Sequence, residues 1–139
     1  MALTATPVFV QTPKVTRTTF TSADTTTAKT IATAGANGSK VVGIQICSDD
    51  TSARAIQFGI TRSATFILLG TINLPIAAGT DGTTPAINGF NPSLMPGLPV
   101  DSDGERYIFM ESGDTLQAKM VVSITAAKTV SVSVVQGDF

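Results

Sequence analysis

The chain has 139 residues, a formal net charge of −1 and only 14% charged residues. This length predicts one domain that buries a core without disulfides or a structural metal. The basic residues are scattered singly, which argues against nucleic-acid binding, and no apolar run reaches the roughly 20 residues of a membrane span.

The first thirty residues are rich in threonine and carry almost no charge. They lack the basic start and the apolar run of a signal peptide. Threonine and valine favour extended backbone, so we expect residues 1–22 to form an extended arm that lies against a partner. Alternatively, residues 7–20 pair as a further strand of the domain.

Apolar and polar residues alternate along most of the remaining chain, residues 23–139, as in half-buried strands. In chain order, the predicted strands are 28–34, 40–48, 53–61, 64–72, 106–110, 115–124 and a last strand from residue 129. In the second strand, Val42, Ile44 and Ile46 are expected to point inward.

Short linkers and side-chain patterns suggest how these strands pair. The turn 48–52, with Asp49 and Asp50 capping backbone N–H groups, predicts a hairpin between 40–48 and 53–61. The linker 125–128 predicts a second hairpin, between 115–124 and the last strand. The strand 64–72 has apolar residues on both faces, which indicates a central position in its sheet.

The alternation lapses over residues 73–105, which are rich in proline and glycine. Loops of this length are usually functional or ordered by a partner. This loop packs either on the core of its own chain or on another protein. Its large apolar residues are Ile87, Phe90, Leu94, Met95, Leu98 and Val100.

Seven or eight short strands predict an all-β, antiparallel β-sandwich or barrel. The long central loop favours a jelly-roll-like sandwich, because Greek-key topologies need long connections. Cys47 alternates with apolar neighbours, so we expect an inert, at least half-buried thiol.

The composition also limits the chemistry. Without histidine, Ser-His-Asp and Cys-His catalysis are excluded, and one cysteine cannot build a common zinc site. The acidic segment 101–105 lacks the spacing of a calcium loop, which favours a surface turn over a cation site. We expect no catalytic residue, cofactor or metal, and no enzymatic activity.

Several segments together resemble a known family: LPIAAGTDGTTPAI, DSDGERYIFM and the terminal GDF, within roughly the last hundred residues. They are similar to capsid decoration (cement) proteins of tailed bacteriophages. The resemblance implies a jelly-roll-like subunit, made in the host cytoplasm, on the outer surface of the virion. It implies the major capsid protein and further copies of the chain as partners, in a dimer or trimer that helps the shell resist the pressure of packaged DNA.

In such a role, the arm would pair by β-augmentation and the central loop would add apolar contacts. We then expect deletion of residues 1–20 to weaken shell binding while the sandwich still folds. The candidate partner-binding residues are Val8, Phe9, Val10, Val15, Phe20, Ile87, Phe90, Leu94, Met95 and Leu98. Another virion part (neck, tail or head-fibre base) or a carbohydrate-binding jelly-roll module is the alternative.

Overall fold

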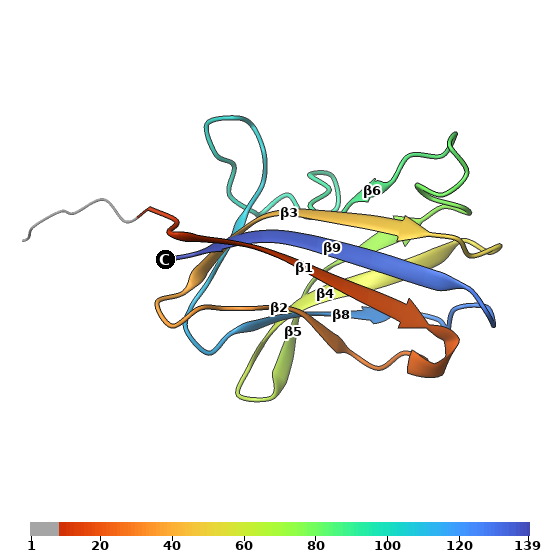
Figure 1. The fold of residues 1–139 in the computed structure, drawn as a ribbon, viewed down its shortest axis with the longest axis horizontal. Helices are drawn as coiled ribbons and strands as arrows, with labels where there is room; N and C mark the ends of the chain where they lie inside the picture. The colour runs from red at the N-terminus through yellow and green to blue at the C-terminus, as the bar shows by residue number, and fades with distance from the viewer. Residues whose placement is uncertain (1–8) are drawn as a thin grey trace, which may run out of the picture.

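The computed structural model describes residues 9–139, and in this range the chain is almost entirely strands and loops (Figure 1). Among these residues, no helix is long and apolar enough to cross a membrane. The elements are β1 (Thr12–Thr21), the 3₁₀ turn η1 (Ser22–Asp24), β2 (Lys29–Thr33), β3 (Ser39–Ser48), β4 (Arg54–Arg62), β5 (Thr65–Leu74), β6 (Ile87–Asn88), β7 (Ile108–Met110), β8 (Thr115–Met120) and β9 (Thr129–Asp138).

The strands form two antiparallel sheets that face each other. Sheet A has the order β1-β9-β3-β6, with β7 also paired to β3, and sheet B has the order β2-β8-β4-β5. The pairing is nested: β1 pairs with β9, β2 with β8, β3 with β6 and β7, and β4 with β5. This nested order is that of a jelly roll, so the predicted all-β, antiparallel sandwich of jelly-roll type is confirmed.

The alternating side chains of the two sheets meet in one core. Val130, Val132 and Val134 of β9 are buried, as predicted, and so are the alternate residues Leu116, Ala118 and Met120 of β8. However, β8 ends at Met120, and Val122, which was expected on the buried face, is exposed. The largest side chains of the core are Phe20, Ile31, Ile46, Ile56, Phe58, Ile72, Leu74 and Leu116.

Both predicted hairpins are wrong. β3 belongs to sheet A and β4 to sheet B, so the turn after Ser48 crosses from one sheet to the other. The linker 121–128 crosses in the same way between β8 and β9. Alternation shows that a strand has one buried face, but it does not show which sheet supplies that face.

β4 and β5 form a hairpin inside sheet B, through a two-residue turn at Ser63 and Ala64. Both turn residues have positive φ, 51° and 64°, as the right-handed twist of a hairpin favours. β5 is therefore the edge strand of sheet B, and its predicted central position is wrong.

A β-bulge changes the faces of β3. The register with β9 shifts between Val41 and Gly43, so Val41 points into the core and Val42 points outward. The prediction of Val42 as an inward residue is therefore wrong, whereas Ile44 and Ile46 are buried as expected. A bulge adds one residue to a strand and so reverses the faces before it.

The N-terminal arm is shorter than the sequence suggested. Residues Thr12–Thr21 form β1, an edge strand paired with β9 over its whole length, so the sandwich starts at Thr12 and not at residue 23. This matches the alternative in which residues 7–20 pair as a strand. Phe20 is fully buried in the core, and only residues 9–11 of the described chain precede β1.

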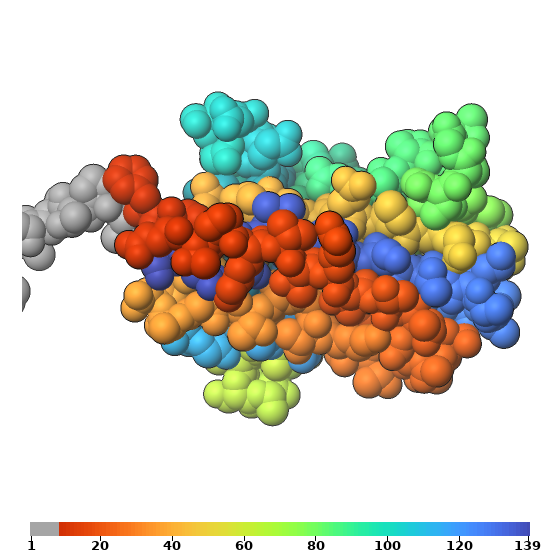
Figure 2. Space-filling view, in the orientation of Figure 1, coloured from red at the N-terminus to blue at the C-terminus, as the bar shows by residue number. Residues whose placement is uncertain are grey.

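The central segment 75–106 packs mainly on its own chain. Phe90 and Met95 are core residues, and Ile87 and Leu98 pack against the core, while Leu94 and Val100 are exposed. The parts of this segment near residues 80–85 (green) and 100–105 (cyan) project from the body (Figure 2).

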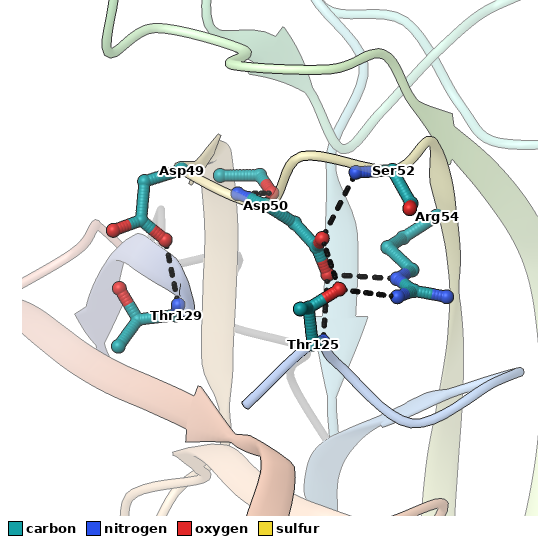
Figure 3. A network of polar contacts seen from close by, with 7 residues as sticks. Asp49, Asp50, Ser52, Arg54, Thr125 and Thr129 are labelled. Carbon is teal, nitrogen blue, oxygen red and sulfur yellow. Dashed lines mark hydrogen bonds and ion pairs between the residues drawn. The ribbon is translucent and has the colours of Figure 1, made fainter. Parts of the chain in front are cut away.

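A buried carboxylate ties together the two connections that cross between the sheets (Figure 3). Asp50 accepts hydrogen bonds from Arg54 Nε (2.7 Å), from the Thr125 hydroxyl (2.7 Å) and backbone N–H (3.0 Å), and from the Ser52 N–H (3.0 Å). Burial alone would raise the pKa of Asp50, but the hydrogen bonds from Arg54 and Thr125 outweigh it and hold this pKa well below its usual range. Asp50 thus caps its own turn, as predicted, and also fixes the connection before β9.

Candidate functional site: the outer face of sheet A

The outer face of sheet A carries a row of exposed valines. Val15 of β1 lies opposite Val135 of β9, which in turn lies opposite Gly43 of β3, next to Val42. Val15 is 60% exposed, and Val42 and Val135 are also exposed. Contiguous apolar surface of this kind marks an interaction site in soluble proteins.

An aromatic patch continues this row where the described chain begins and ends. We define it as Phe9, Tyr107, Phe109 and Phe139, together with Val10. The ring centroids of Tyr107 and Phe109 are 5.0 Å apart in an edge-to-face arrangement, and those of Phe109 and Phe139 are 6.0 Å apart. Phe9, Val10, Phe109 and Phe139 line a hollow of about 480 Å³ together with Lys40.

Backbone hydrogen bonds hold both ends of the chain at the patch. The Gln11 N–H donates to the Asp138 carbonyl (2.8 Å), and the Phe139 N–H donates to the Gly38 carbonyl (3.2 Å). A side chain at Gly137 would collide with Val10, so this glycine lets the leading segment lie flat on β9.

The side chain of Asp138 stabilises the same end of the chain. Its carboxylate forms an ion pair with Lys14 (2.5 Å) and accepts hydrogen bonds from the Ser39 hydroxyl and from Gln136 Nε2 (3.1 Å). The hydrogen bond from Lys14 is the main cause that lowers the pKa of Asp138, followed by that from Ser39. The charge of Lys14 is thereby compensated within the chain.

One further cation borders the patch. Lys40 Nζ lies 4.3 Å from the ring centroid of Tyr107, in a cation–π arrangement, and 4.0 Å from an Asp101 carboxylate oxygen. The site is therefore apolar, with a charge at its rim that is already paired.

A second hollow, of about 430 Å³, opens over β3 and β6. It is lined mainly by Val42, Gly43, Ile44, Ile87, Phe90 and Val135. In Figure 2 the two projecting parts of the central segment rise on either side of this region. A partner with a convex ridge would reach the valine row between them.

The polar groups of the described residues serve structure. Among residues 9–139, no group of three or more His, Cys, Asp or Glu side chains could hold a metal ion. The acidic segment 101–105 forms a turn closed by a hydrogen bond from the Gly104 N–H to the Asp101 carbonyl (3.1 Å). Cys47 is half-buried, as predicted.

The second buried carboxylate, Asp114, holds a turn of the chain. Arg62 donates two hydrogen bonds to it (2.6 and 2.8 Å), which lower its pKa. The Glu111 N–H donates a third (2.9 Å).

The predicted partner-binding residues fall into three groups. Phe9, Val10 and Val15 are exposed on the outer face of sheet A, and Leu94 is exposed on the central segment. Phe20, Phe90 and Met95 are core residues and Ile87 and Leu98 are half-buried against the core, so their assignment as accessible contacts is corrected. Val8 lies outside the described residues.

Sequence reasoning missed five members of the site: Val42, Tyr107, Phe109, Val135 and Phe139. The pattern RYIFM contains a signal for Phe109, because Tyr107 and Phe109 alternate with the buried Ile108 and Met110. Two bulky aromatics on the outer side of a strand indicate a covered surface. The outward direction of Val42 depends on the bulge in β3, and the sequence contains no signal for this bulge.

Comparisons with known proteins give a distant structural likeness. No family model matches the chain, and no curated protein matches it. The chain is similar to a chain of the solved structure "Cyanophage Pam1 capsid asymmetric unit", with 20% identity over 99% of this chain and 94% of that chain, at a TM-score of 0.47. Function at this distance has to be argued from the residues of the chain itself.

Proposed function

We propose that the protein is a structural part of a phage virion: a capsid decoration protein that binds the outside of the assembled shell and cements neighbouring subunits. Its partners are the major capsid protein and further copies of itself, and its role is not catalytic. The distant likeness to a chain of the cyanophage capsid is consistent with this proposal, but the proposal does not depend on it.

The observation that carries the proposal is the exposed apolar face of sheet A. The aromatic patch and the valine row together place Phe9, Val10, Val15, Val42, Phe109 and Val135 in solvent. Burying one such side chain fully is worth about 1.5–3 kcal/mol, so leaving several of them exposed is explained best by a partner that covers them.

The chemistry of this face favours a large protein partner. Two charges at its rim, Lys14 and Lys40, are paired within the chain, and one exposed cation, Arg17, lies two residues after Val15 on β1. Apolar contact therefore supplies most of the expected binding free energy. Apolar contact is additive over area, and a standard interface buries about 800 Å² per partner. A subunit that touches several capsid proteins also gains avidity, because its later contacts are intramolecular.

The test is co-sedimentation of the purified protein with empty mature shells. Val15→Ser and Phe109→Ser remove apolar contact from the proposed face without touching the core, and each is expected to weaken binding about tenfold. Val122→Ser is the matched control, because Val122 is similarly exposed (56%) but lies outside sheet A. Binding should persist when salt is raised.

Unchanged binding of both sheet A variants would overturn the assignment of this face. Deletion of residues 1–20 does not test the arm alone, because it would also remove most of β1 and the core residue Phe20. A deletion that ends at Gln11 removes Phe9 and Val10 and leaves the sandwich whole. We expect this shorter deletion to weaken shell binding and to leave the melting temperature nearly unchanged.

A carbohydrate-binding module is the candidate from another class, and the aromatic hollow gives it one supporting feature. Sugar recognition also needs polar groups for the hydroxyls, and Lys40 is the one polar side chain among the residues that line this hollow. Binding on a glycan array that Phe109→Ser abolishes would favour that module. Electron microscopy of intact particles would separate a shell protein from a neck, tail or fibre part.

A further inference from the structure

Each sheet has one long edge strand of ten residues, and these two edges differ in how they are protected. Sheet A ends in β1 and sheet B ends in β5. An edge strand presents unpaired N–H and C=O groups and is a template for another strand. Proteins that stay apart guard such edges with proline, lysine and arginine, or cover them.

The β1 edge is guarded. Pro13, Lys14 and Arg17 lie along it. In addition, Lys29 Nζ of the opposite sheet donates a hydrogen bond to the Thr19 carbonyl (2.7 Å), which occupies part of the open backbone. A strand that approached β1 would meet a missing N–H and two cations.

The β5 edge carries no such guard. Its sequence, TFILLGTINL, contains no charged residue and no proline. Ile67 and Leu68 are 57% and 53% exposed, and the β4–β5 hairpin projects from the body (Figure 1). The protection found here is a β-bulge on β5 itself: Phe58 pairs with Gly70 and Gly59 with Leu68, so Leu69 is an extra residue of the edge strand.

A shallow apolar hollow lies beside this edge. It measures about 290 Å³ and is lined by Leu68, Leu69 and the segment 94–98. Gly70 makes the packing of this segment possible, because a side chain there would run into Met95. Exposed leucine and isoleucine side chains and an apolar hollow thus lie next to each other on one edge.

We propose that β5 is the edge through which two copies of this chain pair, antiparallel, across a two-fold axis near Leu68. A two-fold axis brings the same edge of both copies together. Each copy would then place its exposed Leu68 near the hollow of the other, and Ile67, the preceding residue, would lie on the opposite face of the joined sheets. The inference rests on the self-association included in the proposed function, but it does not require the shell.

The distribution of charge favours a second copy as the occupant. A strand that pairs with itself places each of its charges close to the same charge of its partner, which is unfavourable. No residue from 63 to 74 is charged, so β5 avoids this repulsion. The nearest cation, Arg62, is paired within the chain with Asp114 and with Glu111 (3.1 Å).

The test measures the mass of the full chain in solution, without shells, by sedimentation velocity over a range of concentrations. The wild type should form a dimer. Leu68→Lys should raise the dimer dissociation constant at least tenfold, because it places two cations near the two-fold axis. Val100→Lys, at a 50% exposed position of the central segment outside both proposed surfaces, is the matched control and should dimerise like the wild type.

A second measurement does not depend on a disruptive variant. Leu68→Cys in a Cys47→Ser background should form an intermolecular disulfide on oxidation, whereas Val100→Cys in the same background should not. Amide exchange of residues 65–69 in the wild type should slow as the protein concentration rises, because a larger fraction of the chains is then dimeric.

A wild type that stays monomeric at all concentrations would overturn the inference, and so would a dimer that Val15→Lys breaks and Leu68→Lys leaves intact. If the monomeric wild type binds shells and Leu68→Lys abolishes that binding, the occupant of the β5 edge is a shell protein, and self-pairing is refuted while the proposed function stands. A dimer that does not bind shells would support self-pairing through β5 and refute the proposed function.

Discussion

Asp50→Asn is expected to destabilise the sandwich far more than an ordinary substitution in a turn. The carboxylate is fully buried and accepts four hydrogen bonds, from Arg54, from Ser52 and twice from Thr125. Asparagine has nearly the same shape, but its NH₂ group would face donors. It also removes the negative charge beside the Arg54 guanidinium, whose side chain is only 15% exposed.

Breaking one partner of a buried charge pair typically costs about 3–5 kcal/mol. Asparagine keeps one acceptor oxygen and Arg54 has some access to water, so we expect a loss of about 3 kcal/mol. For a domain of this size, a loss of about 3 kcal/mol lowers the melting temperature by roughly 10 °C. It would be a large part of the 5–15 kcal/mol that stabilises a typical domain.

Urea unfolding followed by circular dichroism gives the free energies. Asp49→Asn is the control, because the neighbouring Asp49 accepts one hydrogen bond, from the Thr129 N–H (2.6 Å), at an exposed position. Its free energy of unfolding should change by no more than about 0.5 kcal/mol. In the double variant with Arg54→Met, the loss should be smaller than the sum of the two single losses. An Asp50→Asn protein within 1 kcal/mol of the wild type would refute the reasoning.

The remaining predictions concern acid, the core and one glycine. The pKa of Asp50 is lowered in the folded state, so the unfolded chain binds more protons in acid; the free energy of unfolding should fall as the pH drops below about 4, and less steeply in Asp50→Asn. Phe20→Ala should lose about 3–5 kcal/mol in urea unfolding because Phe20 is fully buried, whereas Phe9→Ala, at a 72% exposed position, should unfold like the wild type. Gly70→Ala should cost about 1–3 kcal/mol because the new methyl group displaces Met95, and a thermal melt equal to that of the wild type would contradict this close packing.

The sequence predicts the layers of this protein better than their connections. Alternation located strands such as 40–48 and 53–61 and identified buried residues such as Ile46 and Phe58, because a half-buried strand has a period of two whichever sheet it joins. Pairing partners depend on non-local packing, and a short linker such as 125–128 fits a hairpin or a crossing between sheets equally well. Either arrangement lets both neighbours of that linker bury an apolar face in the same core, so alternation does not decide between them.

The candidate site was predictable in part for a related reason. Phe9, Val10 and Val15 drew attention because they interrupt a polar segment, and they are exposed as an interaction surface requires. Phe20 belongs to the same segment, yet it is buried because β1 continues until it covers the end of the core. Val15 and Phe20 are five residues apart on β1, so their side chains point to opposite faces of the strand, and Phe20 is the one that faces the core.

The nested pairing has a consequence for synthesis on the ribosome. In sheet A, β9 lies between β1 and β3, and in sheet B, β8 lies between β2 and β4. Both are translated after all the strands that flank them, so until they emerge the nascent polypeptide has the β4–β5 hairpin but neither complete layer. Pairing between strands that are far apart in sequence is slow compared with local pairing. Until β8 and β9 pair with them, the earlier strands are exposed to neighbouring nascent chains. A chaperone that shields early strands would therefore raise the yield of folded protein more than it would for a simple up-and-down sheet.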